Sequence, residues 1–151
     1  MKLAEALSIR SDLQKRINML NSRLKKSCTV KEGDTPPEDV HSLLKELDSS
    51  LKRCRELIYR INYTNMHATV DGRSITDIMA ERDILQQRVR IYHDVIKTLI
   101  DGPDRWGRDE KVVRLLDVPS FRKEADRYSK ELRELNLKLQ QINWEIDLLD
   151  V

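Results

Sequence analysis

The chain has 151 residues, of which 36% are charged and 39% are hydrophobic, with only four glycines and four prolines. This profile is typical of long exposed helices and excludes a sheet-rich globule. The net charge is +2 and residues of both signs are interleaved, so no basic stripe indicates binding to DNA or RNA.

The sequence also bounds where the protein is expected to act. It contains no apolar run of about 18 residues, so no membrane-spanning helix is predicted. Charges recur every few residues from the N-terminus onward, which is unlike an ordinary secretory signal peptide. We therefore expect one cytoplasmic domain over residues 1–151, without a membrane or nucleic-acid partner.

Two amphipathic helices are predicted in the first half of the chain, over residues 2–26 and 38–67. The second begins after Pro37, because proline suits a first helical turn. Its predicted apolar seam has 4-3 spacing and consists of Val40, Leu44, Leu47, Leu51, Cys54, Ile58 and Ile61. Cys28 and Cys54 are expected to stay unpaired, because about 24 Å separates them and a disulfide needs Cα atoms within about 7 Å.

Two more helices are predicted in the second half, over residues 74–100 and 119–150. Asp71-Gly72 is a turn signal, and Ser74 resembles the N-cap of the third helix. The fourth helix has the longest seam, spaced 4-3 throughout: Phe121, Ala125, Tyr128, Leu132, Leu135, Leu139, Ile142, Ile146 and Leu149.

Four helices of similar length predict an all-α, antiparallel four-helix bundle with coiled-coil-like packing. In an up-down-up-down bundle, the first and third connections lie at the same end. Each contains an extended candidate, at residues 28–31 and at residues 112–116, where the Val- and Leu-rich stretch 111–117 favours a strand. We predict that these two segments pair as a small two-stranded β-ribbon.

Two helices carry apolar residues away from their main seams. We expect these residues to form the contact surface of a homo-oligomer, since Trp and Tyr are frequent anchors of protein interfaces. The predicted interface consists of Tyr59, Tyr63, Met66, Leu137, Trp144 and Leu148. The alternatives are that the chain itself covers these residues, or that they line a ligand pocket.

A set of polar residues lies near the middle of the chain. It consists of Asn62, Asn65, Asp71, Arg73, Arg82 and Asp83. Asn65 and Arg82 fall on seam positions, where polar residues usually fix helix register or oligomer state; the alternative is a small polar binding site. For Arg82 we expect Asp71 or Asp77 as the ion-pair partner, because adjacent residues point about 100° apart on a helix.

Motifs for catalysis, metal binding or cofactor binding are not recognisable in the sequence. The three histidines, His41, His67 and His93, do not lie at metal-ligand spacing. Phosphate-binding loops and nucleophile elbows are absent. We therefore expect a non-enzymatic protein without a cofactor, a metal or a known small-molecule partner.

Three stretches together are similar to a known family. They are MKLAEAL with DLQKRI, then RINYTN with DGRSITDIMAERDIL, and finally RWGRDEKV with DVPSFRKEADRYSKELRELNLKLQQINWEIDL. The sequence resembles a family of small bacterial helical proteins of uncharacterised function that is often labelled septicolysin. The resemblance implies a bacterial, all-helical, oligomeric protein, and the label implies a cytolysin.

The sequence leaves three hypotheses for the function of the protein. The first hypothesis is a non-enzymatic, homo-oligomeric helical scaffold or interaction protein. A membrane-active cytolysin, as the label implies, is one alternative. The other is a small-ligand binder at the region of Asn62, Asn65 and Arg82.

Overall fold

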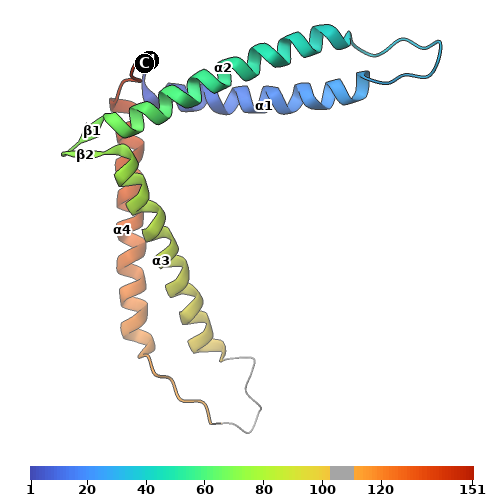
Figure 1. The fold of residues 1–151 in the computed structure, drawn as a ribbon. Coiled ribbons are helices and arrows are strands. Elements are labelled where there is room, and N and C mark those ends of the chain that lie inside the picture. The colour runs from blue at the N-terminus through green and yellow to red at the C-terminus, as the bar shows by residue number, and fades with distance from the viewer. Residues whose placement is uncertain (103–110) are drawn as a thin grey trace. The chain divides into compact units, whose positions relative to one another are not determined.

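The computed structural model describes residues 1–102 and 111–151, which form four long helices and one two-stranded sheet (Figure 1). The helices are α1 (Leu3–Ser27), α2 (Val40–His67), α3 (Ile75–Asp101) and α4 (Val118–Glu145), and the strands are β1 (Thr69–Val70) and β2 (Arg73–Ser74). The prediction of an all-α fold with a small two-stranded ribbon is confirmed. Residues 103–110, which belong to the third predicted connection, lie outside the described residues.

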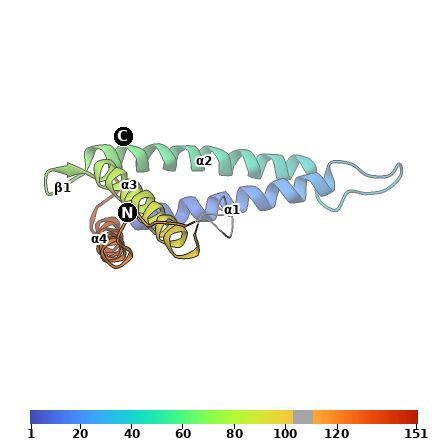
Figure 2. The same cartoon turned by 90° about the horizontal axis from the view of Figure 1, so that it is seen from below.

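The chain divides into two compact units. The first contains Met1–Ile75 and Ile142–Val151, and the second contains Thr76–Gln141. Within the first unit, α1 and α2 lie side by side and antiparallel (Figures 1 and 2). Within the second unit, α3 lies beside the part of α4 that belongs to it. A single domain over residues 1–151 stays a prediction.

The core of the first unit is one row of side chains from each helix of the pair. The buried residues are Leu3, Ala6, Leu13, Leu20 and Ser27 from α1, and Leu43, Ser50, Cys54, Leu57, Ile61 and Thr64 from α2. Burying these apolar side chains stabilises the pair by about 25 cal/mol for each Å² removed from water.

The inner row of α2 differs from its predicted seam. Leu44, Leu51 and Ile58 were predicted to lie inside, but they are between 38% and 47% exposed. Ser50 and Thr64 take inner positions instead. The prediction was wrong because it was based on large apolar residues alone. Two helices also approach each other at small polar residues whose backbone or hydroxyl groups form hydrogen bonds.

The strands form a local hairpin between α2 and α3. Thr69 pairs with Ser74, and Val70 pairs with Arg73. Asp71 and Gly72 join them with φ angles of 51° and 77°, both left-handed, as a two-residue type I′ turn requires. The turn predicted at Asp71-Gly72 is therefore confirmed.

The predicted partners of the ribbon are wrong, since residues 28–31 and 111–117 contain no strand. The observed strands are separated by two residues, whereas the predicted ribbon would join segments far apart in the sequence. Closing a long loop costs more conformational entropy than closing a two-residue turn, and two isolated strands of this length do not offset that cost.

The C-terminal segment completes the first unit. Helix α4 ends at Glu145, five residues before its predicted end. Leu3 N then donates to Ile146 O at 2.9 Å, and Leu148 N donates to Met1 O at 2.8 Å. These hydrogen bonds to the N-terminus replace those of a further helical turn, which is why the helix stops although the apolar spacing continues through Leu149.

Aromatic rings join the two helices of the second unit. Tyr92 on α3 stacks on Phe121 of α4 with ring centroids 4.6 Å apart, and it meets the edge of Tyr128 at 5.2 Å. Ala125 and Leu139 of the same predicted α4 seam are buried. The position of that seam is thus confirmed for the part of α4 that lies in this unit.

Candidate functional site: two apolar surfaces on the first unit

Most of the residues predicted for an oligomer interface lie on the surface. Tyr59, Met66, Leu137 and Trp144 are between 57% and 65% exposed. Tyr63 is half-buried and stacks on His67, with ring centroids 4.0 Å apart. Tyr59, Tyr63, Met66 and Trp144 belong to the first unit, and we call these four residues the aromatic surface.

Two of the six predicted interface residues stand apart from the aromatic surface. Leu148 is only 7% exposed, because its segment is bonded to the N-terminus, so we exclude it from the interface. Leu137 is exposed, but it belongs to the second unit; it precedes Trp144 by seven residues on the continuous helix α4.

Hydrogen bonds hold the end of α2 against the chain's C-terminal segment. Leu149 N donates to Thr64 Oγ1 at 3.0 Å, and Arg60 Nε donates to Leu149 O at 3.3 Å. Arg60 also forms an ion pair with Asp150, at 2.6 Å. The part of α2 that carries Tyr59, Tyr63 and Met66 is therefore fixed beside the segment that follows Trp144.

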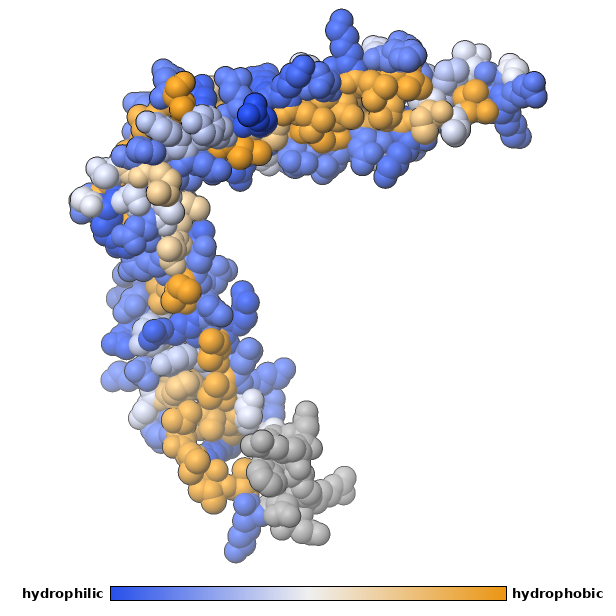
Figure 3. Space-filling model, viewed as in Figure 1, coloured by the Kyte–Doolittle hydropathy of each residue, from blue (hydrophilic) through white to orange (hydrophobic). Residues whose placement is uncertain are grey.

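A second apolar surface runs along α2. Leu44, Leu51 and Ile58 are exposed and lie seven residues apart, which is two helical turns. We call these three residues the α2 row. Figure 3 shows an apolar band along α1 and α2, bordered by hydrophilic residues. These three residues were identified in the sequence, but their regular spacing led to their interpretation as core.

Charged residues flank the α2 row. Asp48 and Arg55 follow Leu44 and Leu51 by four residues, so each lies one turn further along the same side of α2. Both side chains are exposed. Asp48 forms an ion pair with Lys52 of the same helix, at 2.8 Å.

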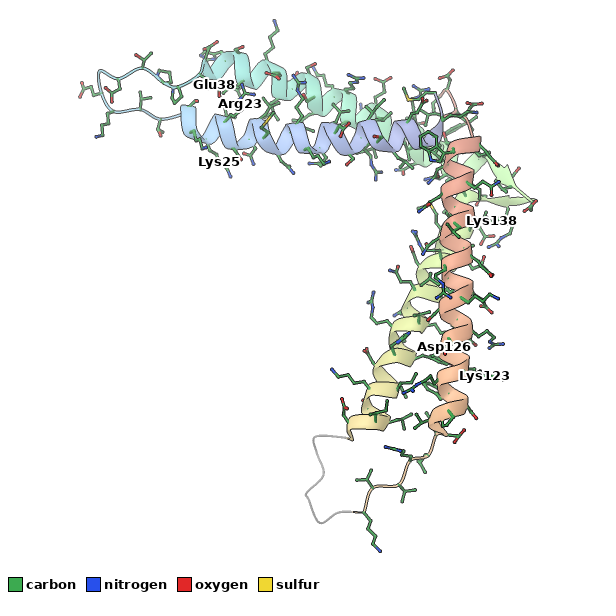
Figure 4. The ribbon with its side chains drawn as sticks, turned by 180° about the vertical axis from the view of Figure 1, so that it is seen from behind. Arg23, Lys25, Glu38, Lys123, Asp126 and Lys138 are labelled. Carbon is green, nitrogen blue, oxygen red and sulfur yellow. The ribbon has the colours of Figure 1, made fainter. Side chains whose placement is uncertain are left out.

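Ion pairs between α1 and α2 fix the antiparallel alignment of the two helices. Arg16 pairs with Glu46 and Arg23 pairs with Glu38. Figure 4 shows Arg23 and Glu38 directed toward each other at neighbouring ends of the helices. Arg23 Nε donates to Glu38 Oε2 at 2.9 Å, and the hydrogen bonds from Arg23 lower the pKa of Glu38 and raise the pKa of Arg23.

The predicted polar set is divided between the units. Asn62, Asn65, Asp71 and Arg73 belong to the first unit, whereas Arg82 and Asp83 belong to the second. Arg82 Nε donates to Asp83 Oδ1 at 2.7 Å. Asp83 is therefore a partner of Arg82 although adjacent residues point about 100° apart on a helix, because the long arginine side chain reaches around the helix to its neighbour.

Other features bear on chemistry and location. In the part of the chain that the structure describes, no group of three or more His, Cys, Asp or Glu side chains is arranged to hold a metal ion. None of the described helices is both long and apolar enough to cross a membrane. Cys28 is exposed and Cys54 is buried, and both are free thiols, as predicted.

Comparisons with known proteins identify a family without assigning a role. The family described as "Family of unknown function (DUF6847)" matches residues 10–148. A solved structure described as a functionally unknown conserved protein from Corynebacterium diphtheriae is 37% identical, covers 99% of both chains and has a TM-score of 0.88. No curated protein matches the chain. Neither description mentions septicolysin, so the comparisons give that label no support.

Proposed function

We propose that this chain, which belongs to the family of unknown function DUF6847, is a non-enzymatic helical scaffold that assembles with copies of itself. The observation that carries this proposal is the aromatic surface, where Tyr59, Met66 and Trp144 are each more than half exposed. A single exposed apolar residue is normal on a protein surface, whereas several large exposed apolar side chains on one unit favour an interaction site.

The composition and rigidity of the aromatic surface favour a protein partner. Trp and Tyr are enriched among the residues that contribute most binding energy at protein interfaces. Tyr63 is already held against His67, and α2 is bonded to the C-terminal segment through Thr64. A surface that is ordered before binding loses less conformational entropy when a partner covers it.

A substitution at Trp144 tests the proposed contact. We expect Trp144→Asp to lower the molecular mass of the assembly in solution, because a carboxylate would be desolvated inside the interface. Size exclusion coupled to light scattering measures the mass. Gln87→Asp, which adds the same charge at an exposed site on α3, serves as the control and is expected to leave the assembly intact. An unchanged mass for Trp144→Asp would show that the contact lies elsewhere.

A further inference from the structure

We propose that the α2 row is a second contact surface, at which α2 packs antiparallel against α2 of a second copy, with the two-fold axis beside Leu51. This inference rests on the proposed self-association and specifies its geometry. Helix α2 has two parallel rows of residues, each with the spacing typical of a buried helix face. One is covered by α1, and the other, formed by Leu44, Leu51 and Ile58, is uncovered within the chain.

The spacing of the row suits a copy of itself. Leu44 and Ile58 lie at equal distances in sequence from Leu51. A two-fold axis perpendicular to α2 at Leu51 brings Leu44 opposite Ile58 of the second copy, and Leu51 opposite its own equivalent. Such an interface is self-complementary, because the same patch is buried on both chains.

The charged residues beside the α2 row favour one relative direction of the two α2 helices. In the antiparallel arrangement, Asp48 of each chain lies close to Arg55 of the other, so opposite charges meet twice. In a parallel two-fold arrangement, the flanking residues of the two chains would lie on opposite sides of the interface, so Asp48 and Arg55 would not meet across it. Charge complementarity thus favours the antiparallel two-fold dimer over the parallel one.

The available area is sufficient for a stable contact. Helix α1 has 25 residues and α2 has 28, so the pair is about 38 Å long and about 20 Å wide, counting a diameter of about 10 Å for each helix. One face then offers on the order of 750 Å², close to the roughly 800 Å² that each partner buries in a stable interface. Two such pairs packed face to face would form a four-helix bundle from two chains.

Disulfide cross-linking tests the position of the axis. In a background with Cys28→Ser and Cys54→Ala, we expect Leu51→Cys alone to give a covalent dimer under mild oxidation, because the two thiols meet at the axis. Leu44→Cys alone is expected to give none, since its equivalent lies about 21 Å away along the helix. A mixture of Leu44→Cys and Ile58→Cys chains is expected to cross-link to each other.

Charge reversal tests the direction independently. Asp48→Arg and Arg55→Asp are each expected to weaken the dimer about tenfold or more, because each single change places like charges in contact twice. The double variant restores both pairs with exchanged signs and is expected to recover the parent's affinity. Failure of the double variant to recover would contradict the pairing of Asp48 with Arg55.

The outcomes separate this inference from the proposed function. An oligomeric protein in which Leu51→Cys does not cross-link would overturn the axis at Leu51 while leaving self-association in place. Cross-linking of Leu44→Cys alone, as efficient as that of Leu51→Cys, would overturn the antiparallel register. A protein that stays monomeric throughout the accessible concentration range would overturn both proposals.

Discussion

The hydroxyl of Thr64 connects residues that are far apart in the sequence. It donates to Arg60 O at 2.8 Å and accepts from Leu149 N at 3.0 Å, and the residue is fully buried. A buried polar group without a partner would destabilise the fold, and here both capacities of the hydroxyl are used. Thr64 therefore fixes the C-terminal segment to α2 and positions the aromatic surface beside it.

Removing this hydroxyl has a defined expected effect. Thr64→Val keeps the shape of the side chain but leaves Leu149 N without its acceptor, so we expect the free energy of unfolding to fall by about 1–3 kcal/mol. Urea denaturation measures the change. Thr98→Val removes a similar hydroxyl bond, to Asp94 O at an exposed site, and is expected to have a much smaller effect. Equal losses for the two variants would contradict the structural role of Thr64.

At the scale of the elements, the ends of α1 and α2 are tied by Arg23 and Glu38. Their hydrogen bonds lower the pKa of Glu38 below its usual value of 4.5. A carboxylate with a lowered pKa in the folded state stabilises the fold above its unfolded pKa, and this stabilisation is lost as the pH falls through the folded pKa.

The stability of the fold should therefore depend on pH through the ionisation of Glu38. We expect the parent to have a higher Tm than Glu38→Gln at pH 7, and the difference to shrink as the pH falls below 4.5 and through the lowered pKa. Thermal melts followed by circular dichroism across this range measure it. Glu32→Gln, an exposed change in the same connection, is the control, and a difference that persists at acid pH would argue against the Arg23 pair.

Sequence patterns predicted the elements better than they predicted the packing between them. All four helices were placed to within about two residues, except the C-terminal end of α4, because apolar periodicity and the Asp71-Gly72 turn are local signals. The end of α4 depends on hydrogen bonds to Met1 and Leu3, which no local pattern contains.

The exposed stretch at residues 111–117 shows the same limit. Its Val and Leu content favours a strand, but a strand forms only where a partner supplies hydrogen bonds, and these residues remain irregular and exposed up to the start of α4. Asp117 instead caps α4 by accepting from Ser120 N at 3.1 Å. The surface assignment of Leu44, Leu51 and Ile58 was missed for a related reason, since spacing alone does not say which of two rows faces α1.

At the scale of the whole molecule, the first unit has a small core and two exposed apolar surfaces. A pair of helices buries side chains on one side of each helix, so a large share of its apolar residues remains in contact with solvent. Association with a second copy covers such residues without requiring a further domain. Tyr59, Tyr63 and Met66 lie on a different face of α2 from the α2 row, which allows both surfaces to be occupied in one assembly.

The molecular mass of the unmodified protein in solution tests self-association most directly. Sedimentation equilibrium over a range of concentrations gives this mass without reference to shape. We expect an integer multiple of 17.8 kDa that dissociates only on dilution. A mass of 17.8 kDa at every concentration would contradict the scaffold function and show that neither apolar surface binds a second copy.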